Sequence, residues 1–126
     1  MAGVPAATQE AIRRKVGTAR VSKGKVTLEL PALVDNGNSV TIAVKVDSPM
    51  TETEHVKAIH LFTEKNPQPD VASFHLGPRA GRASVTTRVR LADTQAVIAV
   101  CELSDGSFWS GSANTVVTLA ACLEEI

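Results

Sequence analysis

The stretch from Arg82 to Leu91 constrains the fold of this chain more than any other part of the sequence. Its residues alternate strictly, with Ala83, Val85, Thr87, Val89 and Leu91 on one side and Arg82, Ser84, Thr86, Arg88 and Arg90 on the other. Such a period of two is typical of a strand, because successive side chains of a strand point to opposite faces. The stretch therefore predicts a strand with one face in a core and the other in water.

A second run, Ala96 to Cys101, is apolar on both faces and predicts a central strand that is covered on both sides. Five further runs read as strands, namely Val26–Leu30, Val40–Asp47, Val56–Thr63, Val71–Leu76 and Phe108–Leu119. Turn signals separate them, among them Asn36-Gly37, which should supply positive φ angles for a tight turn between the first two runs. Short strands at this spacing predict an all-β fold, an immunoglobulin-like antiparallel β-sandwich.

The beginning of the chain reads differently from the rest. A short helix is predicted from Thr8 to Gly17, with Thr8 as its N-cap and Gly17 as its stop signal. At 126 residues the chain fits one domain. We divide it into an N-terminal helix and lead-in (1–24), a sandwich (25–119) and a flexible C-terminal arm (120–126).

Charge and hydropathy weigh against two classes of partner. Lys plus Arg and Asp plus Glu number 13 each, so nothing in the charge balance favours nucleic acid or an anionic membrane surface. No apolar run approaches the roughly 18 to 20 residues that span a bilayer. The first residues lack the pattern of a signal peptide, so we expect either a cytoplasmic protein or a mature domain without its leader.

The two cysteines predict different behaviour. Cys101 lies in the doubly apolar run, opposite about Ser110 if the turn between the last two strands is tight, and should be a buried hydrophobe. Cys122 follows the last strand, four residues before the end of the printed sequence, where an exposed thiol can react. We do not expect the two to form a disulfide, because the intervening strand separates them by tens of ångströms at about 3.3 Å per residue.

Other side chains that can carry chemistry do not form a complete active site. His60 and His75 fall on the two arms of one predicted hairpin and could hold a metal ion as a pair, but no third ligand lies at a recognisable spacing. Hydrogen-bonded or surface histidines are therefore the preferred interpretation. The arginines of the Arg82–Leu91 strand are interpreted as a solvated face. No metal site and no cofactor are predicted.

Six motifs in order resemble one known family, SoxY, the sulfur-carrier subunit of the bacterial thiosulfate-oxidising Sox system. They are Asp35-Asn36-Gly37-Asn38, Val46-Asp47-Ser48-Pro49-Met50-Thr51, His55-Val56-Lys57-Ala58-Ile59-His60-Leu61-Phe62, Lys65-Asn66-Pro67-Gln68-Pro69, Thr87-Arg88-Val89-Arg90-Leu91-Ala92-Asp93-Thr94-Gln95 and Ser104-Asp105-Gly106-Ser107. The resemblance runs from about Lys25 to Leu119.

The resemblance implies a covalent carrier rather than an enzyme. It implies a periplasmic location, a second β-sandwich subunit of SoxZ type as a stable partner, and transient partners: the heme enzyme SoxAX, the hydrolase SoxB and a sulfur dehydrogenase. By its position after the final strand, Cys122 corresponds to the cysteine that carries sulfur in that family. An exposed thiol in an oxidising compartment could also link two copies of the chain, so a disulfide homodimer through Cys122 is expected.

The sequence departs from the family around this cysteine. The family ends in Gly-Gly-Cys-Gly-Gly, whereas here Ala120-Ala121 precede Cys122 and Leu123-Glu124-Glu125-Ile126 follow it. Alanine restricts the backbone relative to glycine, and the two glutamates oppose thiolate formation. Two alternatives therefore stay open: a SoxY-like module that binds partners but has lost carrier chemistry, and a metal-dependent enzyme that uses His60 and His75.

Overall fold

The computed structural model describes residues 4–119. It contains one α-helix, α1 (Ala6–Val16), a short 3₁₀ helix, η1 (Pro78–Ala80), and nine strands. The strands are β1 (Val21–Lys23), β2 (Val26–Glu29), β3 (Leu33–Val34), β4 (Val40–Val46), β5 (Val56–Thr63), β6 (Asp70–His75), β7 (Ser84–Val89), β8 (Gln95–Leu103) and β9 (Phe108–Val117). Within this part of the chain no helix is long and apolar enough to cross a membrane.

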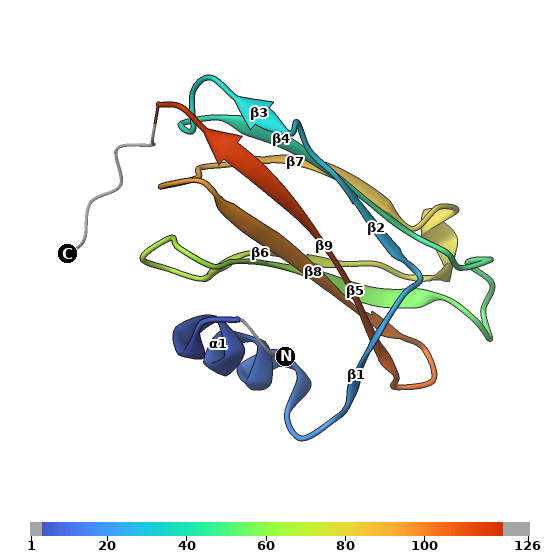
Figure 1. Cartoon of the computed structure of the whole chain (residues 1–126). Helices are drawn as coiled ribbons and strands as arrows, with labels where there is room; N and C mark the ends of the chain where they lie inside the picture. The colour runs from blue at the N-terminus through green and yellow to red at the C-terminus, as the bar shows by residue number, and fades with distance from the viewer. Residues whose placement is uncertain (1–3, 120–126) are drawn as a thin grey trace.

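The strands form two sheets packed face to face. The large sheet has the order β1-β9-β8-β5-β6, with β3 also paired to β9, and the small sheet has the order β2-β4-β7. Figure 1 shows the small sheet above the large one and α1 on the opposite face of the large sheet. The predicted β-sandwich with a short N-terminal helix is confirmed.

The two runs that most constrained the fold lie where their patterns predicted. β7 is an edge strand that pairs with β4 alone, and it buries Val89 while Arg88 and Arg90 are exposed. β8 lies in the middle of the large sheet and is almost entirely buried. Its Val97 and Ala99 face the small sheet, whereas Ile98 and Val100 pack against α1. The helix α1 therefore covers the second apolar face of β8, as the sequence pattern of this strand predicted.

Two local predictions were wrong. Thr8 is not the N-cap of α1: the helix begins two residues earlier, and Thr8 is completely buried inside it. The Asn36-Gly37 pair does not make a positive-φ turn, since in residues 4–119 positive φ occurs at other residues. Instead Gly37 N–H donates to the carbonyl of Leu119 (2.7 Å) and its carbonyl accepts from Leu91 N–H (2.8 Å), so this loop bridges two distant strands. The register of the last two strands agrees with its prediction, since Cys101 lies opposite Trp109, next to Ser110.

Two strands were not predicted at all. β1 and β3 both pair with β9 in parallel, and they are three and two residues long. Such short segments carry no periodicity that a sequence pattern can detect. β3 lies beside the end of β9, so it helps to define the place from which residues 120–126 continue.

Candidate functional site

The structure buries one of the two cysteines. The side chain of Cys101 lies in the core between Ile59 and Trp109 of the neighbouring strands, with 0% of its surface exposed. This burial raises the pKa of the Cys101 thiol to about 11. Since the thiolate is the reactive form, Cys101 is inert at neutral pH, as its sequence environment predicted.

Cys122, the predicted site residue, lies outside the described residues. What the structure does define is the segment that leads to it, which ends at Leu119, three positions before the cysteine. The candidate site is therefore built from the residues that hold the end of β9. We call the residues that hold it, Ala32, Val34, Asp35, Gly37 and Thr94, the collar.

The collar holds the backbone of β9 on two sides. On the β3 side, Val116 N–H donates to the carbonyl of Ala32 (2.9 Å) and Thr118 N–H donates to that of Val34 (3.0 Å). The hydroxyl of Thr118 lies within 3.3 Å of the Val34 carbonyl and 3.2 Å of the Asp35 carbonyl. On the β8 side, Val117 N–H donates to Oγ1 of Thr94 (2.9 Å). The chain is hydrogen-bonded up to Leu119, so its exit point is well defined.

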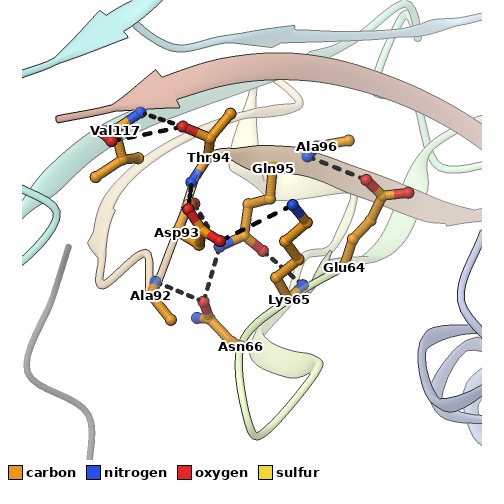
Figure 2. Close-up of polar contacts among 9 residues, drawn as sticks. All are labelled: Glu64, Lys65, Asn66, Ala92, Asp93, Thr94, Gln95, Ala96 and Val117. Atoms are coloured by element: carbon orange, nitrogen blue, oxygen red, sulfur yellow. Dashed lines mark hydrogen bonds and ion pairs between the residues drawn. The ribbon is translucent and has the colours of Figure 1, made fainter.

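A hydrogen-bonded network of one buried amide, Gln95, and one half-buried amide, Asn66, lies beside Thr94 (Figure 2). Gln95, with 5% of its surface exposed, accepts from Lys65 N–H (2.9 Å) and donates to Oδ1 of Asn66 (3.0 Å). Asn66 also accepts from Ala92 N–H (2.9 Å) and donates to the carbonyl of Arg90 (2.7 Å). Satisfied buried amides of this kind fix loops in one arrangement.

The network explains two of the sequence motifs. Asn66 belongs to the Lys65–Pro69 motif, and Gln95 ends the Thr87–Gln95 motif. Asn66 and Gln95 are 29 residues apart in sequence, yet their amides contact each other beside the exit point of β9. Neither amide was predicted as a site residue, because the contact joins distant segments and only the family resemblance marked both motifs together.

The histidine pair forms a structural contact. His60 and His75 do come together, with ring centroids 6.2 Å apart. His60 is buried and its Nδ1 is 2.7 Å from the hydroxyl of Ser73. Among residues 4–119 no group of three or more His, Cys, Asp or Glu is placed to hold a metal ion. The two rings are on the face of the large sheet that α1 covers. Phe62 and Val100, which pack beneath the helix, are on the same face.

Comparison with solved structures identifies the fold. The sulfur carrier protein SoxY from Chlorobium limicola f thiosulfatophilum superposes with a TM-score of 0.74 at 27% identity, covering 88% of this chain and 96% of that one. A superoxide reductase (neelaredoxin) from Ignicoccus hospitalis gives 0.66 at 16% identity, covering 75% and 80%. A putative superoxide reductase from Thermotoga maritima gives 0.63 at 23% identity, covering 78% and 87%. The two reductases share the fold alone.

The sequence comparisons are more specific than the shared fold. None of the curated proteins compared matches the chain. The family described as "Sulfur oxidation protein SoxY" matches residues 12–122, which begin in α1, include both motifs of the amide network and end at Cys122. With most of its length matched, this chain belongs to the SoxY family of sulfur oxidation proteins.

Proposed function

We propose that this protein is a sulfur carrier of thiosulfate oxidation that holds its intermediates covalently on Cys122. The observation that carries the proposal is the extent of the family match, which runs through the whole sandwich and ends at this cysteine. The solved SoxY structure, described as a sulfur carrier protein, supports it. Burial of Cys101 adds to it, because Cys122 is the other of the two cysteines in the sequence.

The proposed chemistry takes place in two steps, both catalysed by partner enzymes. In the first, the Cys122 thiolate bonds to the outer sulfur of thiosulfate to give Cys–S–S–SO₃⁻, and the two electrons released pass to the heme enzyme SoxAX. In the second, SoxB adds water to the sulfone sulfur, which leaves as sulfate with two protons, and a persulfide anion stays on Cys122. The carrier is a substrate of these enzymes and does not catalyse either step.

The proposal includes partners and a location. A SoxZ-type β-sandwich subunit would be the stable partner, SoxAX, SoxB and a sulfur dehydrogenase the transient ones, and the periplasm the compartment. Membership of the SoxY family supports partners from the Sox system in general. The same thiol could join two carriers in a disulfide homodimer under oxidising conditions.

Intact mass spectrometry tests the carrier role. The chain, its Cys122→Ser variant and its Cys101→Ser variant are incubated with thiosulfate, SoxAX and an oxidised electron acceptor. We expect the native chain and the Cys101→Ser variant to gain one thiosulfate and the Cys122→Ser variant to gain none. Modification of Cys122→Ser would refute the assignment of this residue.

A variant with a glycine arm separates the carrier from the alternative function. The alternative is a SoxY-like module that binds partners but has lost carrier chemistry, and the Ala120-Ala121 and Leu123-Glu124 flanks of Cys122 are the observation that favours it. Replacing those four residues by glycine restores Gly-Gly-Cys-Gly around the cysteine. If the glycine variant gains thiosulfate and the native chain gains none under the same conditions, the interaction module is the correct function.

A further inference from the structure

Exposed apolar side chains gather at one end of the molecule. Among residues 4–119, the large hydrophobic residues that are exposed are Leu33 (59%), Val116 (50%) and Leu119 (59%). Leu33 is in β3, Val116 is near the end of β9 and Leu119 lies two residues beyond that strand, so all three are close in the fold to the point from which the chain continues toward Cys122. We call them the arm-base patch. The rest of the described surface has no comparable residue, which makes their clustering informative.

Leu33 and Val116 are held side by side by the sheet. They are directly paired in the parallel register of β3 and β9. The next pair, Val34 and Val117, turns into the core, where Val34 is buried and Val117 packs against it. Alternation therefore forces Leu33 and Val116 together onto the outer face, and the collar hydrogen bonds keep both backbones in place. The exposure follows from a well-ordered part of the sheet.

An open hollow lies beside Val116 on the same end of the large sheet. Its volume is about 510 Å³, and Gln95, Ala96 and Asn114 are among the residues that line it. Glu64 and Lys65 also line it: Lys65 faces Asp93 at 3.9 Å, and the Glu64 carboxylate accepts from Ala96 N–H (3.2 Å). With two carboxylates and one ammonium group the hollow is slightly acidic, so a partner that fits this surface needs apolar side chains, a shallow projection and no strong negative charge.

The distance to Cys122 determines which partner covers the patch. Three backbone steps separate Leu119 from Cys122, so their Cα atoms lie at most about 11 Å apart, at roughly 3.6 Å per step. An enzyme that takes the Cys122 thiol into a recessed site must bring the rim of that site within this distance of Leu119. Its rim then comes close to the end of the sheet that carries Leu33 and Val116, because Thr118, the neighbour of Leu119, is hydrogen-bonded to Val34 of β3.

We propose that the arm-base patch is the docking surface for the enzymes that act on Cys122, each presenting an apolar rim around its active-site entrance. The inference rests on the proposed function, because it names the surface through which the carrier is recognised. Burial of apolar area would drive the contact, so affinity should depend only weakly on salt concentration. The collar would hold the patch in a fixed position at the start of the segment that leads to Cys122.

Binding of the partner enzyme provides the direct test. The Leu33→Thr/Val116→Thr double variant replaces both side chains by a polar residue that suits a strand. Surface plasmon resonance measures its affinity for SoxAX, on a Cys122→Ser background so that no chemistry contributes. We expect Kd to rise about tenfold or more relative to Cys122→Ser alone. A Leu33→Ile/Val116→Ile variant should bind as the parent does, and so should Thr27→Ser/Thr86→Ser, which changes two exposed residues of the small sheet.

Steady-state conjugation of thiosulfate gives a second measurement with Cys122 present. The double variant should raise KM for the carrier while kcat at saturation changes little, because the patch acts in docking. Alkylation of Cys122 by iodoacetamide should proceed at the native rate, since a small reagent needs no docking surface. Circular dichroism and the urea midpoint show whether the double variant is folded.

The outcomes separate this inference from the proposed function. If the native chain is modified and the double variant has unchanged KM and Kd, the patch is not a docking surface. If the native chain is never modified but binds SoxAX through the patch, the docking inference holds and carrier chemistry fails. Sedimentation velocity covers the two other occupants, a second copy of this chain and the SoxZ-type subunit. If the double variant abolishes either of these complexes while SoxAX binding is unaffected, the patch belongs to that partner and the proposal is overturned.

Discussion

At the scale of single residues, Gly111 shows how closely the two sheets approach. A Cβ atom built on Gly111 would overlap the carbonyl oxygen of Val26, because β2 passes directly over β9 at this point. The glycine lies within a strand that keeps an unbroken register with β8. A glycine inside a strand indicates either a bulge or the close approach of another backbone, and here the cause is the close approach of Val26.

Substituting Gly111 tests this close contact. Gly111→Ala should lower the free energy of unfolding by about 1–3 kcal/mol, because the obstructing atom belongs to the backbone and cannot turn away. Gly77→Ala is the matched control: Gly77 has φ of −143°, and no atom lies within 4 Å of an added Cβ. Urea denaturation should place the control within about 0.5 kcal/mol of the native chain. Equal effects of the two substitutions would contradict the packing argument.

At the scale of elements, α1 is attached to the large sheet by packing and by one buried hydrogen bond. Ala11, Ile12 and Val16 pack on the face of the sheet that β8 presents away from the sandwich. Thr8 donates its hydroxyl to the carbonyl of Thr63 at the end of β5 (2.9 Å). In an isolated helix of this length such contacts would be absent, and the helix would be marginal. Tertiary contacts therefore account for its presence.

Two threonine substitutions should change stability in opposite directions. Thr8→Val removes the buried donor and leaves the Thr63 carbonyl with one partner fewer, which should cost about 1 kcal/mol. The Oγ1 of Thr63 is itself buried without a hydrogen-bond partner among the described residues, so Thr63→Val should be neutral or stabilising by up to about 1 kcal/mol. Thermal denaturation of both variants checks the signs. A Thr8→Val variant as stable as the native chain would show that the bond contributes nothing.

At the scale of the whole molecule, His60 links stability to pH. Burial lowers the pKa of its imidazole below the ordinary value of 6.5, and the charges of Lys15 and His75 lower it further. Asp70 and Glu102 act in the opposite direction and do not overcome this. The unfolded chain therefore binds a proton more readily than the folded one at this residue. Its contribution to stability is complete above pH 6.5 and is lost as the pH falls toward the folded pKa.

This linkage predicts a measurable pH dependence. The urea midpoint of the native chain should fall between about pH 7 and pH 5, and His60→Gln, which has no titrating group at this position, should lose part of that slope. His75→Gln should keep most of the slope, because it removes a smaller cause of the lowered His60 pKa and leaves the burial of the imidazole, the largest cause, in place. If His60→Gln and the native chain have the same slope through this range, protonation of His60 does not limit stability.

Residue patterns determined much of this protein without reference to its tertiary structure. The alternation of polar and apolar residues in Arg82–Leu91 predicted a strand with one buried face. The run that ends in Cys101 is apolar at every position, and this predicted a central strand and a buried cysteine. Periodicity is local, so it specifies which face of a strand is buried and how many layers must cover it. The six motifs added the family, and with it Cys122 as the expected site.

Contacts between distant segments were decided by the tertiary structure. Three features have no local sequence pattern, because each depends on a partner more than twenty residues away. They are the short parallel strands β1 and β3, the hydrogen bond of buried Thr8 to β5, and the contact of Asn66 with Gln95. The exposed pair of Leu33 and Val116 belongs to the same class. An apolar residue in the sequence predicts burial, and only the register of β3 on β9 turns these two outward beside the path to Cys122.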